Sequence, residues 1–243
     1  MKVPLPRHGF KALCLLALLV GYVSTLAQVT YQAGLDKKKV HFGIQLGYTQ
    51  SKFEDAYTQD DEVRQSLQGT TSYYTPGFHI AEINDFRLGN YFNLRISPGL
   101  TLISRTFNYN WTDAYVTQHH GADAKRSVES AYGELAVDFK FRAFRYQNFR
   151  PYLTAGGSYG YDFASFRNNK NNTDKSIVRL NTSDLRYTAG LGFDFFLRYV
   201  KFAIELKMSF GITDLKIEDD DLYTRSTDFI NTRTFMLGFT FEG

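Results

Sequence analysis

Ten charged residues stand at alternate positions of strand-like segments, and ion pairing is the chemistry that they offer. In residues 132–142, for example, Glu134, Asp138 and Lys140 alternate with bulky apolar side chains. Alternate residues of a strand share one face, so such a segment has one charged face and one apolar face. Both signs occur in similar numbers, which predicts a network of ion pairs among Arg95, Arg105, Glu134, Asp138, Lys140, Arg142, Arg186, Asp194, Glu205 and Lys207.

The histidines and one serine are the other candidates for chemistry. His41 and His79 fall in strand-like segments, whereas His119 and His120 are adjacent in a polar segment. A closed metal site needs three or four ligands at fixed geometry, and no spaced partner set accompanies the adjacent pair. A hydrolytic site that combines this pair with Ser130 would need a base within hydrogen-bonding reach of the nucleophile. Because nothing in the sequence fixes that geometry, we predict no catalytic residue, no metal ligand and no cofactor.

Eight segments with a period of two must position these groups. The clearest spans residues 40–50, where apolar Phe42, Ile44 and Leu46 alternate with polar or small residues. This period is typical of a strand with one apolar face. The other segments are residues 77–85, 91–109, 132–142, 151–165, 184–196, 202–213 and a last stretch over 235–241. Glu82 breaks the apolar face of the second segment, and Pro98 predicts a bulge or kink in the third because proline cannot donate to the ladder.

The connections between these segments alternate in length. Residues 51–74, 110–131, 166–183 and 214–232 form long polar segments, whereas residues 86–90, 144–150 and 197–201 form short links. Barrels of bacterial outer membranes show this asymmetry, with short periplasmic turns and long extracellular loops. In lipid, only helices and closed barrels satisfy every backbone polar group. The sequence therefore predicts an all-β, eight-stranded antiparallel transmembrane β-barrel in a Gram-negative outer membrane, with both termini in the periplasm.

Small residues support closure of the barrel. Nine glycines fall on the faces opposite the apolar ones: Gly43, Gly47, Gly99, Gly156, Gly160, Gly190, Gly192, Gly211 and Gly238. The interior of an eight-stranded barrel is just wide enough for its side chains, so small residues are needed there. A soluble lipocalin-like barrel would bury the apolar faces instead, and it is disfavoured because glycines and charges share the other face. We expect the interior charges to form a structural plug, with a conduction path as the less favoured alternative.

The N-terminal residues predict a secretory signal peptide. Lys2, Arg7 and Lys11 precede an apolar stretch over residues 12–23, and Thr25 and Ala27 put small residues at the two cleavage-determining positions, the pattern of a cleaved signal. An uncleaved anchor would need about 20 apolar residues. We divide the chain into a signal peptide (1–27), a short periplasmic segment (28–39) and the barrel (40–243). The single cysteine, Cys14, lies in the signal, so the mature barrel offers no disulfide or thiol chemistry.

The charge balance excludes a nucleic-acid ligand. The chain has 28 basic and 25 acidic residues. The three basic residues of the signal account for the whole excess and leave 25 of each sign. A balanced chain has no basic field to attract nucleic acid. The high aromatic content of 16% suits the interfacial girdles of a barrel.

Several blocks resemble the PorT family in the same order along the chain. Residues 91–100 read YFNLRISPGL, and residues 134–141 are followed by NFRPY at 148–152. Further similar blocks are residues 156–162 and 192–196, then Phe202, residues 205–207 and 210–211 of the seventh segment, and the ending at 239–242. Ala136 stands where proline is usual in the family and Phe141 where tyrosine is usual. The resemblance extends from Val40 to the C-terminus.

The resemblance implies an outer-membrane component of the type IX secretion system, which exports proteins with a C-terminal signal, including cysteine proteases. It implies an accessory or assembly role rather than the conduit. The expected partners are outer-membrane lipid and other components of that system, with no nucleic acid and no small-molecule substrate. Two alternatives remain open. One is an adhesin that acts through the long loops, and the other is a barrel enzyme that hydrolyses lipid or peptide.

Overall fold

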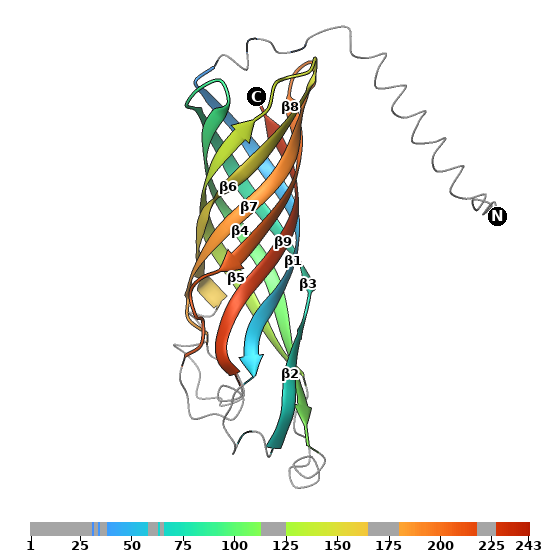
Figure 1. Cartoon of the computed structure of the whole chain (residues 1–243), viewed down its shortest axis with the longest axis vertical. Coiled ribbons are helices and arrows are strands. Elements are labelled where there is room, and N and C mark those ends of the chain that lie inside the picture. Colours follow the sequence, from blue (N-terminus) through green and yellow to red (C-terminus); the bar gives the residue numbers. More distant parts are fainter. Residues whose placement is uncertain are drawn as a thin grey trace, which may run out of the picture.

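Antiparallel strands close into a ring in the computed structural model, which describes residues 31, 34, 38–57, 63, 66–112, 125–164, 180–217 and 227–243 (Figure 1). The strands are β1 (Val40–Tyr57), β2 (Leu67–Tyr73), β3 (Thr75–Arg87), β4 (Phe92–Trp111), β5 (Lys125–Arg142), β6 (Phe149–Asp162), β7 (Ser183–Phe196), β8 (Lys201–Gly211) and β9 (Thr227–Glu242). No helix among these residues is long and apolar enough to cross a membrane.

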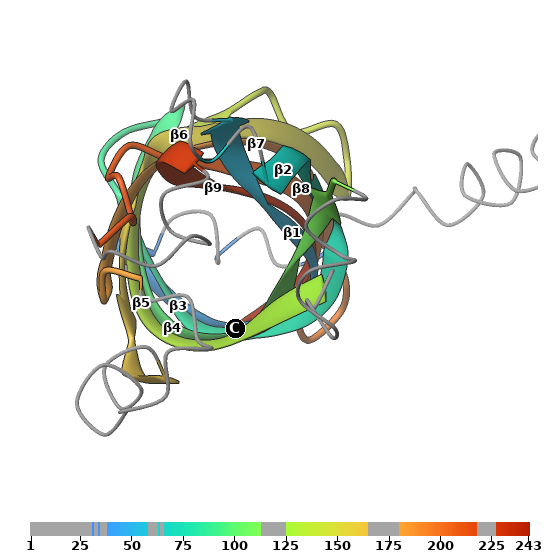
Figure 2. The same ribbon diagram turned by 90° about the horizontal axis from the view of Figure 1, so that it is seen from below.

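Eight of the strands form the ring. The order runs β4-β3-β1-β9-β8-β7-β6-β5, and the pairing of β5 with β4 closes it (Figure 2). The remaining strand, β2, continues β3 along β4: Tyr73 pairs with Thr106, and Gly77 of β3 pairs with Ile103. Strand β2 therefore extends one wall beyond the ring. The structure confirms the predicted eight-stranded antiparallel barrel.

The two ends of the barrel differ. At one end, the short-turn end, residues 88–91, 143–148 and 197–200 connect neighbouring strands. Both Val40, where β1 begins, and the C-terminal Gly243 lie at this end, and Gly243 donates a backbone hydrogen bond to Phe42. The opposite end, the long-loop end, is where β1 ends at Tyr57 and β4 at Trp111, and where β5 begins at Lys125 and β9 at Thr227 (Figure 1).

The strands continue farther toward the long-loop end than the alternation predicts. Strand β1 runs to Tyr57 and β5 begins at Lys125, although the alternation predicts loops over residues 51–74 and 110–131. Strand β9 likewise begins at Thr227, inside the expected loop 214–232. Cross-strand hydrogen bonds sustain these extensions. The apolar period is lost because a wall outside lipid needs no apolar outer face.

The predicted bulge at Pro98 is wrong. The pairs Ala81–Gly99 and Asn84–Ile96 keep one register on either side of this position, and Pro98 pairs in register with Leu135 of β5. The pairing between β3 and β4 is instead interrupted for the two residue pairs between them. The missing N–H of proline is thus accommodated by a local gap in the ladder rather than by an extra residue.

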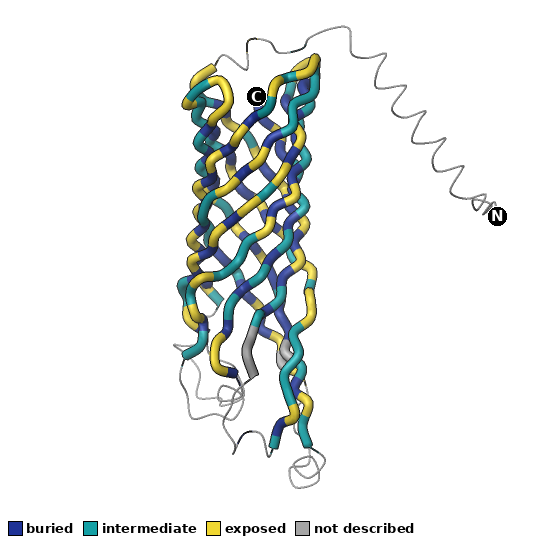
Figure 3. Tube along the Cα trace, in the orientation of Figure 1, coloured by how far each residue is buried: buried dark blue, intermediate teal, exposed yellow. Residues whose placement is uncertain are grey.

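The two faces of the wall have opposite chemistry, and exposed and buried residues alternate along the strands (Figure 3). On β8, Leu206 is 53% exposed whereas the neighbouring Glu205 and Lys207 are buried. Apolar side chains face outward and polar ones face the lumen, as the alternation predicts. Glycine makes room inside: a Cβ on Gly192 would overlap the ring of Tyr152.

This arrangement predicts different effects for arginine on the two faces of β8. Leu206→Arg should lower the free energy of unfolding by about 2–4 kcal/mol if the residue lies at the bilayer midplane. Ser209→Arg, on the lumen face, should act only through crowding and charge. Urea titration of the two variants in lipid vesicles measures the difference. Equal and severe loss of membrane assembly for both variants would contradict the assignment of faces.

Candidate functional site in the barrel lumen

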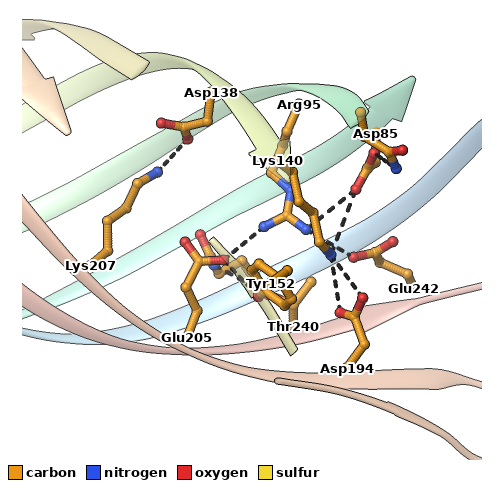
Figure 4. A network of polar contacts seen from close by, with 12 residues as sticks. Asp85, Arg95, Asp138, Lys140, Tyr152, Asp194, Glu205, Lys207, Thr240 and Glu242 are labelled. Carbon is orange, nitrogen blue, oxygen red and sulfur yellow. Dashed lines mark hydrogen bonds and ion pairs between the residues drawn. The ribbon is translucent and has the colours of Figure 1, made fainter. Parts of the chain in front are cut away.

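Arg95 of β4 is the centre of a buried ion-pair network (Figure 4). Arg95 lies three residues after the start of β4, in the half of the lumen nearer the short-turn end. Its guanidinium lies 2.8 Å from Glu205 of β8, 3.4 Å from Asp85 of β3 and 3.3 Å from Glu242 of β9. All four side chains are at most 1% exposed. One cation therefore joins three carboxylates from three other strands.

Lys140 of β5 extends this network around the ring. Its ammonium donates to both carboxylate oxygens of Asp194 on β7, at 3.0 and 3.1 Å, and lies 3.7 Å from the ring centre of Tyr152 on β6. The Tyr152 hydroxyl donates to Glu205 at 2.8 Å. Lys201 adds an ion pair to Glu242. With Arg95, these contacts connect seven of the eight strands of the ring, all but β1.

Two further groups lie deeper in the lumen. Lys207 pairs with Asp138 at 2.5 Å, and Asp138 also accepts a hydrogen bond from Thr188. Arg186 lies 3.1 Å from Glu134 and 3.7 Å from Asp184. Because charges of opposite sign fill the interior in contact with one another, the lumen is a packed plug of side chains.

All ten charged residues singled out in the sequence point into the barrel, but they do not form one set. Arg105 donates to the hydroxyls of Ser51 and Tyr132 at 2.8 and 3.1 Å. Arg142 donates to the backbone carbonyl of Gly89 at the short-turn end. The remaining eight occupy the ion-paired groups described above.

The sequence interpretation missed five residues that complete these groups: Asp85, Tyr152, Asp184, Lys201 and Glu242. Extending the alternation would have found most of them. Asp85 has the same parity as His79, and Glu242 has the same parity as Gly238. Lys201 was assigned to a turn, although it is the first residue of β8.

An apolar cluster lies at the long-loop end, beyond the charged interior. It consists of Phe53, Val63, Leu67, Tyr109, Val128, Leu180, Leu215 and Ile230, with Trp111 packed against it. Each of the eight core members is at most 9% exposed. Several belong to the strand extensions, so the extra strand length builds an apolar cap. The sequence interpretation missed this cap because all of its eight core members except Tyr109 fall in segments expected to be polar loops.

The filled lumen and its cap predict an electrically silent barrel. Purified protein inserted into a planar lipid bilayer should give no stable conductance steps, because buried ion pairs such as Arg95–Glu205 and Lys140–Asp194 occupy the interior. An open porin inserted in the same way provides the positive control. Reproducible single-channel steps that scale with protein concentration would contradict the plug.

One constellation brings a hydroxyl, an imidazole and a carboxylate together. His79 Nδ1 lies 2.8 Å from the Thr101 hydroxyl, which donates to Glu134 at 2.9 Å. A hydroxyl has one proton, so His79 must donate to Thr101 instead of accepting from it. A general base needs the reverse arrangement, and this contact therefore does not activate a nucleophile.

The other histidines and Ser130, which the sequence analysis considered as candidates for chemistry, form no such constellation among the described residues. His41 and Ser130 are buried on the lumen face, and His119 and His120 lie outside the described residues. Within the part of the chain that the structure describes, no group of three or more His, Cys, Asp or Glu residues could hold a metal ion.

A closed barrel with an apolar outer wall and a polar interior defines a transmembrane β-barrel of the outer-membrane type. Residues 27–216 match the family model described as an outer membrane protein β-barrel domain. The chain belongs to this family, and the match agrees with the predicted location in a Gram-negative outer membrane.

Several solved outer-membrane barrels are similar to the chain at low identity. The outer membrane protein OprG from Pseudomonas aeruginosa is 11% identical, with a TM-score of 0.44 over 84% of this chain and 94% of OprG. Neisserial surface protein A is 10% identical, with a TM-score of 0.43 over 82% and 95%. Ail of Yersinia pestis, in complex with a heparin analogue, is 14% identical, with a TM-score of 0.40 over 85% and 100%. No curated protein matches the sequence significantly.

Proposed function

We propose that this protein is a noncatalytic accessory component of type IX secretion, with its short-turn end in the periplasm. The observation that carries the proposal is the plugged lumen. Packed ion pairs around Arg95 and Lys140 fill the interior, and an apolar cap lies between them and the long-loop end. A barrel filled in this way cannot pass a protein, so it must act through its outer surfaces. The ordered sequence blocks that resemble the PorT family supply the link to this secretion system.

The short-turn end offers a surface for such a role. Its turns expose Phe144, Tyr146 and Tyr199 at 79%, 74% and 80%. Residues 88–91, 143–148 and 197–200 contain arginine but no acidic residue. Exposed aromatic and arginine side chains are enriched in protein interfaces. The surface formed by these three turns supports docking to a partner in the periplasm.

The long-loop end favours a second candidate, a surface adhesin. Strand β2 and the end of β4 project beyond the ring (Figure 1), and a projecting wall of this kind suits contact with a ligand outside the cell. Deletion of the gene followed by analysis of secreted proteins separates the two candidates. An accessory component is required for export of cargo with a C-terminal signal, whereas an adhesin is dispensable for export and is required for adhesion.

A further inference from the structure

A polar patch interrupts the apolar outer wall on β3. Glu82 is exposed on this wall and Asn84, two residues away, is partly exposed. Around them, Ile44 of β1, Ile80 of β3 and Leu100 of β4 are also exposed and apolar. The outward positions on the two neighbouring strands, 42–48 on β1 and 92–102 on β4, carry only aliphatic or aromatic side chains and Pro98.

The patch lies inside the apolar band rather than at its edge. Phe86 marks the aromatic end of the apolar band on β3 near the short turns, and Tyr74, the residue just before β3, marks the other end. Glu82 is four residues from Phe86, and a strand rise of about 3.3 Å per residue with a tilt of about 40° puts its Cα about 10 Å into the band. The band is about 25 Å tall, so a glutamate side chain at this depth does not reach the headgroups.

The hydrogen-bond ladder between β3 and β4 is also interrupted at this point. Opposite Glu82 stands Pro98, and the ladder between β3 and β4 is interrupted for the pairs Glu82–Pro98 and Ile83–Ser97. Among the described residues, no hydrogen bond or ion pair satisfies the Glu82 carboxylate. Glu82, Asn84 and Pro98 together are called the wall patch below. The wall patch combines an unpaired carboxylate, an amide and a gap in the hydrogen-bond ladder.

Lipid offers no hydrogen-bond donor at this depth, and an unsatisfied polar group there is costly. We propose that the wall patch is the docking site of a second, different protein embedded in the same membrane, which places a lysine or arginine against Glu82. A second copy of this chain does not fit as well, because within the band none of its described outward side chains is cationic. The cations on the outer wall, such as Lys52 and Arg233, lie toward the long-loop end. This inference does not depend on the type IX role.

Photo-crosslinking in cells tests the proposal. A photoreactive amino acid at Ile80, 41% exposed beside Glu82, should give one major adduct with a membrane protein, and the same probe at Leu191, 43% exposed on the opposite wall, should not. Glu82→Leu should reduce the Ile80 adduct at least tenfold. Glu129→Leu removes an outward carboxylate outside the band and should leave the adduct unchanged.

In vesicles, Glu82→Leu should raise the urea midpoint of the purified barrel, which separates lost docking from lost folding.

The decisive support is a charge exchange. The crosslinked peptide should map to a membrane-embedded segment with a lysine or arginine, and Glu82→Lys should regain at least half of the adduct when that cation is changed to glutamate. An adduct with lipid alone, an adduct with a second copy of this chain, an undiminished adduct in Glu82→Leu, or a lowered urea midpoint for Glu82→Leu would each overturn the proposal. Loss of the adduct with normal cargo export would retain the docking site and show that this contact is not needed for export.

Discussion

Cells that lack this protein should fail to export cargo with a C-terminal signal, and the cargo should accumulate unprocessed in the periplasm. The expectation follows from the proposed type IX role. The lumen around Arg95 is packed with buried ion pairs, so under this proposal the protein acts on the assembly or operation of other components rather than as the conduit. Mass spectrometry of the culture medium and of the periplasmic fraction, each normalised to total protein, measures the effect. Secretion at the wild-type level would refute the proposed role and favour the adhesin.

A triple variant provides the matched control for chemistry. Replacing His79, His119 and His120 with alanine should leave export nearly normal. His79 donates to Thr101 in the arrangement deduced above, so removing its ring takes away a structural contact and no general base. If the triple variant is inserted at normal abundance and yet exports nothing, the noncatalytic interpretation fails and an enzymatic role becomes the leading hypothesis.

The sequence predicts the wall well because lipid constrains one face of every strand. Phe42, Ile44 and Leu46 must face outward for the barrel to remain in the membrane, so their period of two is unbroken. Because alternate residues of a strand point to opposite faces, the residues between these apolar ones must face the lumen. The alternation alone is therefore sufficient to place Arg95 and Lys140 in the lumen. Pairing partners could not be predicted, because they depend on how far each long side chain reaches across the interior.

Outside the lipid, that constraint disappears. Phe53 and Ile230 lie in segments with mixed polar composition, yet both belong to the buried apolar cap. Their environment is set by contacts between distant parts of the chain, such as the hydrogen bond from Leu215 to the Ile230 carbonyl. A local sequence pattern carries no information about such contacts. The strand extensions and the cap were therefore missed together, for one physical reason.

Replacing Arg95 with methionine should destabilise the barrel by about 3–5 kcal/mol, because it leaves buried carboxylates without their shared cation. Asp85, Glu205 and Glu242 all contact this guanidinium at 3.4 Å or less. Urea unfolding in vesicles gives the free energy, and Trp111, the only tryptophan in the chain, supplies a fluorescence signal from the cap.

The control is Arg233→Met, which removes an arginine that pairs with Glu54 at a similar distance of 2.7 Å. These two side chains are 33% and 42% exposed, and an exposed pair contributes only about 0–1 kcal/mol. The double variant Arg95→Met with Glu205→Gln should recover part of the loss, because it removes the negative charge of the carboxylate closest to the missing guanidinium. Equal, small effects of Arg95→Met and Arg233→Met would mean that water screens the lumen charges, and the barrel would then be wet rather than plugged.

If Arg95→Met lowers export, the loss should follow the amount of inserted protein. An export defect at full abundance would instead give the lumen a direct part in secretion.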